Sequence, residues 1–113
     1  MHEQSIVESL LALVLENAEK EKAKKILRIY LVVGELSGVV EDAVNFYFNF
    51  ISRDTIAEGA SIFFMNIPAK VKCRNCDNVY SPEKHDYHCP NCGEQKVDII
   101  SGRELYLERM EIE

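Results

Sequence analysis

Several features that would direct this sequence to common protein classes are missing from it. It has no tryptophan, and its 113 residues include only 5 glycines and 3 prolines. No apolar run approaches the roughly 18 residues that indicate a transmembrane helix, so we expect no membrane span. The start, Met1-His2-Glu3-Gln4, lacks the basic region of a signal peptide. We therefore expect a cytoplasmic protein.

An excess of basic residues is also missing. Lysine and arginine number 13 against 19 aspartates and glutamates, so the formal net charge is −6. A general nucleic-acid binder is usually basic, and this balance argues against nucleic acid as a partner. Hydrophobic residues make up 47% and charged residues 28%, which indicates a folded rather than a disordered chain.

Motifs for catalysis are missing too. There is no Ser/His/Asp arrangement and no glycine-rich phosphate loop. The three histidines are His2 at the start of the chain and His85 and His88 in a cysteine-rich segment. We therefore expect that the protein is not an enzyme.

The sequence does contain four cysteines, in two Cys-x-x-Cys motifs separated by twelve residues. Cys73 and Cys76 form the first motif, and Cys89 and Cys92 form the second. Two such loops that face each other offer four thiolates in a tetrahedron, which is the usual closed structural site for zinc. The site would leave no open coordination position, so we expect it to stabilise the fold rather than to catalyse hydrolysis.

Two alternatives use the same cysteines. The thiols could form reducible disulfides or redox pairs, although nothing else in the chain indicates secretion. Iron could also occupy the same four-sulfur set, which would give a rubredoxin-like electron carrier.

The N-terminus is a second candidate metal site. The Met1 amine, the His2 amide nitrogen and the His2 imidazole can chelate one metal in fused rings, with Glu3 as a source of a fourth donor. Nitrogen donors in a planar arrangement suit Ni(II) or Cu(II). The alternative is that His2 is simply an exposed residue near a frayed end.

Hydrophobic periodicity predicts the main elements. Residues 5–19 have helical spacing, and Ser5 with Glu8 suggests a capping box at the start. Residues 26–33 are apolar on both faces, which predicts a central strand. Residues 40–53 fit either a helix or a strand, and we favour the helix because Glu41 and Asp42 suit a first turn.

The remaining segments complete an α+β fold. Residues 62–67 and 105–112 predict two further strands, so the core would be a small three-stranded sheet with two helices. The polar segment between these strands predicts an inserted zinc-ribbon-like module with four cysteine ligands. We expect a core domain of residues 1–70 and 98–113, and a zinc-binding domain of residues 71–97.

These features together resemble the HypA family of nickel metallochaperones in hydrogenase maturation. The resemblance covers nearly the whole chain. It rests on Met1-His2-Glu3, on the segment 33–39 (Val-Gly-Glu-Leu-Ser-Gly-Val), on the paired Cys motifs and on Gly102-Arg103-Glu104-Leu105. Family members often carry Pro-Glu where this chain has Val40-Glu41, so the start of the second helix differs from the family pattern.

The resemblance implies a role for each candidate residue. By this resemblance, nickel would bind to His2 with Met1 and Glu3, in the core domain. Structural zinc would bind to Cys73, Cys76, Cys89 and Cys92. Glu41 or Asp42 could add a carboxylate to the nickel site. His85 and His88 are either auxiliary nickel ligands or ordinary loop residues.

The resemblance also implies partners. These are a HypB-type GTPase and the large-subunit precursor of nickel–iron hydrogenase, with urease maturation proteins as a further client system. The strand at 62–67 and the apolar face of the second helix could pair with another chain, which would give a homodimer. The alternative function is a zinc-ribbon module that binds a protein or a nucleic acid without nickel.

Overall fold

The computed structural model of this chain describes residues 3–83 and 86–113. Two helices and six strands follow one another in this part of the chain: α1 (Glu3–Lys20), β1 (Ile26–Gly34), α2 (Glu41–Ile51), β2 (Ser61–Ile67), β3 (Lys70–Cys73), β4 (Val79–Tyr80), β5 (Val97–Ser101) and β6 (Leu105–Ile112). This order confirms the predicted α+β class, with the cysteine-rich segment inserted between two strands of the first sheet.

The chain divides into two compact units. The first consists of Met1–Val32, Val39–Met65 and Tyr106–Glu113, and the second of Val33–Gly38 and Asn66–Leu105. The second unit therefore contains the whole predicted zinc-binding segment, together with the loop after β1 and residues on both sides of the segment. The assignment of nickel to one domain and zinc to the other stays a prediction.

The helix α1 forms because apolar residues recur along it at steps of three and four. Its buried residues are Val7, Leu10, Val14 and Ala18. The predicted capping box of Ser5 and Glu8 is wrong, because the helix already begins at Glu3 and Ser5 lies within it. Glu8 instead accepts a hydrogen bond of 3.2 Å from the side chain of Gln4, one helical turn before it.

The strand β1 is central in the first unit, as predicted. The strand order is β2-β1-β6, so β1 has a hydrogen-bonded neighbour on each side. Its apolar residues fill the core of the sheet, and those buried are Ile26, Ile29, Leu31, Val32 and Val33.

The ambiguous segment at 40–53 contains a helix, which confirms the preferred interpretation. In α2, Val44 and Phe48 are buried one turn apart, whereas Phe46 and Phe50 are exposed on another face. The alternation of phenylalanines that imitates a strand in the sequence therefore reflects two helix faces, one in the core and one in solvent.

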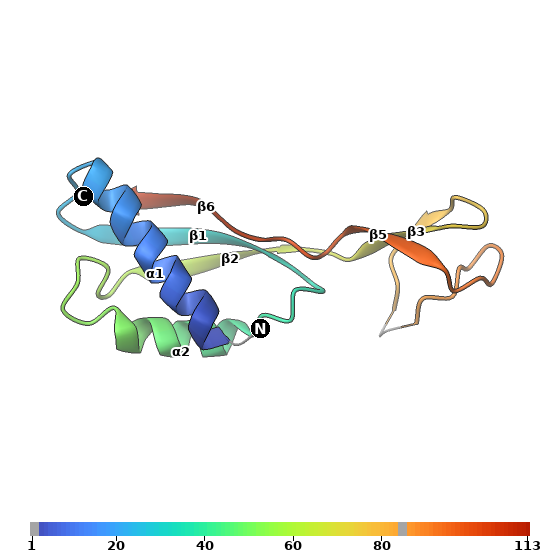
Figure 1. Cartoon of the computed structure of the whole chain (residues 1–113), viewed down its shortest axis with the longest axis horizontal. Coiled ribbons are helices and arrows are strands. Elements are labelled where there is room, and N and C mark those ends of the chain that lie inside the picture. Colours follow the sequence, from blue (N-terminus) through green and yellow to red (C-terminus); the bar gives the residue numbers. More distant parts are fainter. Residues whose placement is uncertain (1–2, 84–85) are drawn as a thin grey trace. The chain divides into compact units, whose positions relative to one another are not determined.

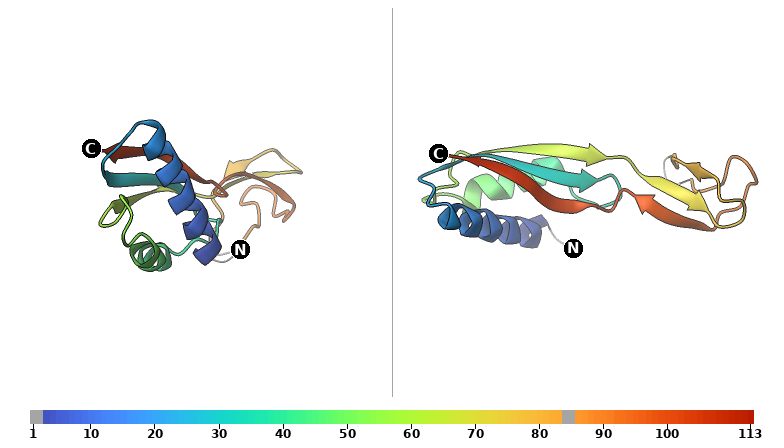
Figure 2. Two further views of the ribbon diagram at one scale, coloured as in Figure 1. Left: turned by 60° about the vertical axis from the view of Figure 1, so that its left-hand side comes forward. Right: turned by 90° about the horizontal axis from the view of Figure 1, so that it is seen from above.

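The first unit is built in two layers. The helix α1 lies across the strands of the sheet (Figure 1), and the view from above separates α1 and the sheet into different layers (Figure 2). The helices α1 and α2 contact each other. Their buried side chains and those of β1 together form the core of this unit.

The second unit is built on its own three-stranded sheet, in the order β4-β3-β5. Both neighbours run antiparallel to β3, where Val71 lies opposite Tyr80 on β4 and opposite Ile99 on β5. Val71 and Cys73 alternate with exposed lysines along β3 and are fully buried. This alternation holds the first cysteine of the cluster inside the unit.

A close approach of two backbone segments ties the loop after β1 into the second unit. A Cβ atom on Gly34 would lie 2.1 Å from the carbonyl oxygen of Gly102. The Leu36 amide donates to that oxygen at 2.6 Å, and the Glu35 carboxylate accepts a bond of 2.9 Å from the Ala69 amide. The loop at 33–38, which lies in the segment on which the family resemblance rests, is thus a structural part of the second unit.

Neither helix in the described part of the chain is long and apolar enough to cross a membrane.

Candidate metal centre

The first Cys-x-x-Cys motif forms a tight loop at the end of β3. The Cys73 amide donates to the carbonyl of Asn78 at 2.8 Å, and the Asp77 amide donates back to the carbonyl of Cys73 at 3.0 Å. Asp77 has a φ of 62°, which turns the chain back after the second cysteine of the motif.

The second motif repeats this loop with other residues. The Cys89 amide donates to the carbonyl of Glu94, and the Gly93 amide donates to the carbonyl of Cys89, both at 2.8 Å. Gly93 has a φ of 80° and occupies the position that corresponds to Asp77 in the first loop. Each motif therefore presents its two sulfurs from the same kind of turn.

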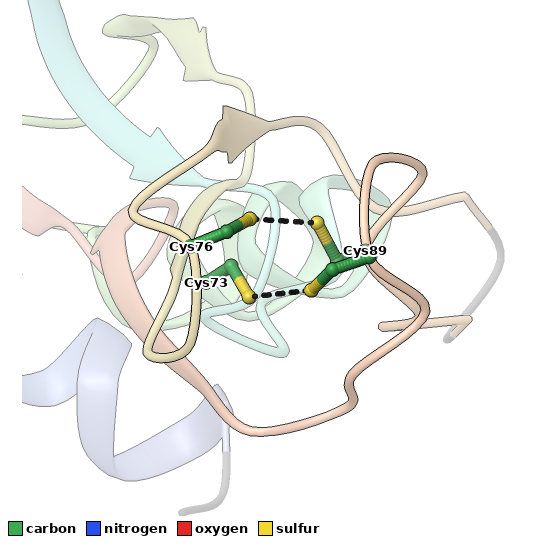
Figure 3. Close-up of side chains that lie close together, drawn as sticks. Cys73, Cys76 and Cys89 are labelled. Carbon is green, nitrogen blue, oxygen red and sulfur yellow. Dashed lines mark hydrogen bonds between the residues drawn. The ribbon is translucent and has the colours of Figure 1, made fainter.

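The four sulfurs form one cluster. The Sγ atoms of Cys73 and Cys92 are 3.5 Å apart, and those of Cys76 and Cys89 are 3.6 Å apart. All four lie within 4.8 Å of one another, and Figure 3 shows the three side chains that it labels, Cys73, Cys76 and Cys89, pointing to a common centre. Sulfurs about 2.3 Å from a tetrahedral zinc would be about 3.8 Å apart, so the cluster fits zinc in size and in donor type.

Side-chain amides of one loop hydrogen-bond to sulfurs of the other. The Asn91 amide lies 3.5 Å from the Sγ of Cys76, and Asn75 bonds in the opposite direction to the thiol of Cys92. Both asparagines directly precede the second cysteine of their motif, so both motifs read Cys-x-Asn-Cys. Neither asparagine was among the predicted site residues, although the repeated asparagine is the sequence signal that could have identified them.

These hydrogen bonds favour the thiolate form at the second motif. Burial alone would raise the pKa of Cys89, but the amides of Cys92 and Asn91 and the Asn78 side chain hold it at about 6. The Asn75 side chain lowers the pKa of the Cys92 thiol. This motif can therefore supply thiolates to a metal near neutral pH.

The first motif behaves differently without a cation. The Cys76 amide lowers the pKa of Cys73, yet burial and the Cys92 thiol raise it to about 11. Four thiolates cannot lie this close together unless a cation neutralises them. The donor set and its surroundings thus suit a closed structural site, in which a divalent metal keeps all four sulfurs ionised.

Of the two loop histidines, His88 is within the described residues and His85 is not. The His88 Nδ1 lies 2.7 Å from the Asp86 carboxylate, and its Nε2 lies 2.5 Å from the amide nitrogen of Gln95. The His88 hydrogen bond lowers the pKa of Asp86. Both ring nitrogens of His88 therefore contact other protein groups, which is what a loop histidine without a metal would show.

The predicted nickel ligands lie at the edge of the described chain. Met1 and His2 fall outside the described residues, and Glu3 is the first residue of α1. Glu41 and Asp42, which the sequence offered as further carboxylates, form the first turn of α2. The structure therefore brings together the four predicted zinc ligands and does not test the nickel ligands.

One family model matches residues 1–112 of this chain, and its description reads "Hydrogenase/urease nickel incorporation, metallochaperone, hypA". The hydrogenase maturation factor HypA of Dehalococcoides mccartyi is 43% identical over 113 residues, which are 100% of this chain and 95% of that protein. The protein of the same name from Caldanaerobacter subterraneus subsp. tengcongensis is 40% identical over 114 residues, with full coverage of both chains.

Two solved structures are also similar. The solution structure of the Ni metallochaperone HypA from Helicobacter pylori has 30% sequence identity and a TM-score of 0.66, over 99% of this chain and 97% of the other. A second solution structure of a HypA protein has 31% identity and a TM-score of 0.72, over 99% of this chain and 96% of the other. The matched region thus spans both units of this chain.

Proposed function

We propose, from the premise that this chain belongs to the HypA family of hydrogenase/urease nickel-incorporation metallochaperones, that it binds Ni(II) at its N-terminus and delivers it to nickel–iron hydrogenase. The observation that carries this proposal is the family match over residues 1–112, which includes Met1-His2-Glu3 and all four cysteines. Proteins of this family are maturation factors, which confirms the prediction that the chain is not an enzyme.

In this proposal, nickel binds to nitrogen donors that the first three residues supply. The Met1 amine, the His2 amide nitrogen and the His2 imidazole form fused chelate rings, and Glu3 provides the fourth donor. The amide nitrogens must lose a proton to bind the metal, so nickel affinity rises with pH. Nitrogen donors of this kind suit the planar coordination of Ni(II).

Nickel is cargo here, so the site must also release it. A chelate at the end of the chain can exchange its ligands one at a time with those of a recipient protein. We infer that the recipient is the large-subunit precursor of hydrogenase, with a HypB-type GTPase as a second partner and urease maturation as a further client system. All of these steps would take place in the cytoplasm.

Zinc has the other role. Cys73, Cys76, Cys89 and Cys92 would hold Zn(II) as a resident structural ion, because the cluster leaves no position for a substrate. The ion supplies charge that stabilises four thiolates and thereby the loops that carry them. This separation gives the protein one metal that stays and one that is handed on.

The nickel site is tested by equilibrium titration of untagged protein with Ni(II). We expect one ion per chain for the wild type, and loss of that binding in His2→Ala and in a chain extended by several residues before Met1. The extension converts the amine into an amide, and His2→Ala removes the imidazole. Unchanged stoichiometry and affinity in both variants would exclude the N-terminal site.

The matched control is His88→Ala. This imidazole is already bonded to Asp86 and Gln95, so its removal should leave nickel affinity at the wild-type value. Zinc content is measured in every variant, because all of them should retain one zinc per chain. A nickel loss in His88→Ala equal to that in His2→Ala would move the site to the cysteine-rich loop.

A further inference from the structure

A row of stacked side chains crosses one face of the sheet in the first unit. Tyr30 lies on the central strand β1, and the ring of Phe63 on β2 stacks on it with centroids 5.2 Å apart and an angle of 17°. From the strand on the other side, β6, the guanidinium of Arg109 lies 3.8 Å from the centre of the Tyr30 ring. The three strands therefore hold one flat, rigid row of groups.

Hydrogen bonds fix this row further. The Tyr30 hydroxyl donates to the Glu111 carboxylate at 2.7 Å, and Arg28 donates to the same oxygen at 3.3 Å. The charged side chains that contact one another or Tyr30 in this row are the arginines Arg28 and Arg109 and one carboxylate, Glu111. Arg109 has no ion pair within the described residues, so its donors remain available. This group of contacting side chains is therefore locally positive on a chain of net charge −6.

The face also exposes more apolar surface than a solvated sheet requires. Phe63 is 46% exposed and Met65, two residues further along β2, is 40% exposed. The strands β1 and β2 run in the same direction (Figure 2), and parallel strands are usually covered on both faces. The centres of protein interfaces differ from the rest of the surface because they are rich in aromatic residues, methionine and arginine and poor in lysine.

The helices of the unit cover the other face. Ile29 and Leu31, which alternate with Tyr30 along β1, are buried with 0% and 3% exposure. The helix α1 lies over that side of the sheet (Figure 2). A partner on the open face would leave α1 uncovered, and α1 is the helix that begins at Glu3, directly after His2.

We propose that this open face, formed by Arg28, Tyr30, Phe63, Met65, Arg109 and Glu111, docks the protein that receives nickel, through a patch of that protein where carboxylates adjoin apolar side chains. The proposal rests on the proposed function, because the recipient is the hydrogenase large-subunit precursor. The planar Arg109 side chain, already fixed on Tyr30, can bind a partner carboxylate with two parallel hydrogen bonds at little further loss of freedom.

A second copy of the chain fits this face less well. Face-to-face pairing would bring the arginines of one copy against those of the other, which is unfavourable in a symmetric dimer. Pairing of this face with a different surface of the second copy would not close into a dimer. The charge of the face therefore favours an acidic partner of another sequence.

The test measures binding of the purified hydrogenase large-subunit precursor to the full-length chain by calorimetry, with zinc present and nickel absent. We expect Arg109→Glu to weaken binding by about tenfold or more, and Phe63→Ser to have a similar effect. The matched control is Arg53→Glu, because Arg53 also lies over an exposed aromatic ring, that of Phe50 on α2, at 5.1 Å. Its affinity should stay within about twofold of the wild type.

Three results would overturn the proposal. These are no binding of the wild type to the precursor, equal affinity of wild type and Arg109→Glu, or an equal loss in Arg53→Glu, which would indicate general charge attraction. Binding of the GTPase or self-association at this face, without binding of the precursor, would assign it to another partner. Hydrogen exchange of the wild-type complex gives a second test, since amides of β1, β2 and β6 should gain protection.

The outcome is independent of the nickel site. Arg109→Glu should bind Ni(II) with wild-type stoichiometry, because its change lies on the sheet face away from α1. A His2→Ala variant that loses nickel binding would support the proposed nickel site. If the same variant still binds the precursor normally, the docking surface is supported independently. If the wild type binds nickel but does not bind the precursor, only the proposed docking surface is contradicted.

Discussion

At the scale of single residues, the cross-bonded asparagines explain how two short loops make one metal site. Asn91 bonds to a sulfur of the first motif and Asn75 to a sulfur of the second, so each loop stabilises thiolates that belong to the other. Amide donors of this kind orient the ligands and offset their negative charge. They also link the two loops independently of the bonds to a metal.

We predict that the double variant Asn75→Ala/Asn91→Ala binds zinc about 10–100-fold more weakly than the wild type, because groups that orient metal ligands typically contribute that much. Competition with a chromophoric chelator measures the change. Asn49→Ala is the control, since Asn49 is exposed on α2 in the first unit. Wild-type zinc affinity in the double variant would show that the asparagines do not support the ligands.

A second prediction at this scale concerns pH. The Tyr30 hydrogen bond is the main cause that lowers the pKa of Glu111 below its ordinary value of 4.5, and Arg28 adds to it. A lowered pKa in the folded state means that Glu111 stabilises the fold above about pH 4.5, and that this contribution is lost as the pH falls through the folded-state value.

Tyr30→Phe should therefore raise the pKa of Glu111 towards 4.5 while the ring stacking on Phe63 remains. A carboxyl-detected NMR titration measures this value directly. An unchanged Glu111 titration would mean that the tyrosine hydroxyl does not set its pKa.

At the scale of elements, α2 shows why one periodicity can hide another. Its phenylalanines at positions 46, 48 and 50 alternate as in a strand, but only Phe48 is in the core, at 1% exposure. Phe46 and Phe50 are 69% and 61% exposed. Val44 and Phe48 are both buried in the core and are four residues apart, and this spacing fits a helix and not a strand.

We predict from this that Phe48→Ala lowers the free energy of unfolding by about 3–5 kcal/mol, the usual effect of removing a buried phenylalanine. Phe46→Ala should change it by less than about 0.5 kcal/mol, because that ring is in solvent. Urea denaturation followed by circular dichroism compares the two. Equal losses in both variants would contradict the assignment of the helix faces.

The elements could be predicted from the sequence where burial dictates the pattern. The helix at 5–19, the strand at 26–33 and the strand at 62–67 all follow from apolar spacing, and the structure confirms them within a few residues. The start of α1 could not be predicted, because Ser5 and Glu8 imitate a cap that the helix does not use. Local motifs compete at helix ends, where no buried contact decides between them.

At the scale of the whole molecule, the two units differ in what stabilises them. The first unit buries a full set of apolar side chains, including Phe48, Ile26, Ile29, Val7 and Val14. In the described part of the zinc-binding segment, residues 71–83 and 86–97, the only buried hydrophobic residues are Val71, Cys73 and Cys89, two of which are candidate zinc ligands. A unit with so few apolar contacts needs the ion to remain folded.

Removal of zinc by a chelator should therefore unfold the second unit and leave the first folded. Hydrogen exchange followed by mass spectrometry tests this, since amides of β3 and β5 should lose protection while those of α2 and central β1 keep it. Restoring zinc should restore the protection of β3 and β5. Simultaneous loss of protection in both units would show that the chain folds as a single cooperative body.

The candidate site could be predicted in part. Four cysteines at fixed spacing are enough to predict a shared ion, because few other groups need four thiolates in that pattern. The repeated Cys-x-Asn-Cys pattern marks Asn75 and Asn91, but the sulfur to which each bonds could not be derived, because it depends on how the two loops face each other. The role of the loop at 33–38 was also missed, since its contacts with Ala69 and Gly102 join residues far apart in the sequence.

The contact between Gly34 and Gly102 has a consequence for how this protein can evolve. When a new side chain collides with another side chain, a second substitution that shortens the neighbour can compensate. Here the obstacle to a methyl group on Gly34 is a main-chain oxygen, which every residue type at position 102 carries. No compensatory substitution is available, so the point where the zinc unit joins the loop can change only if the backbone path itself changes.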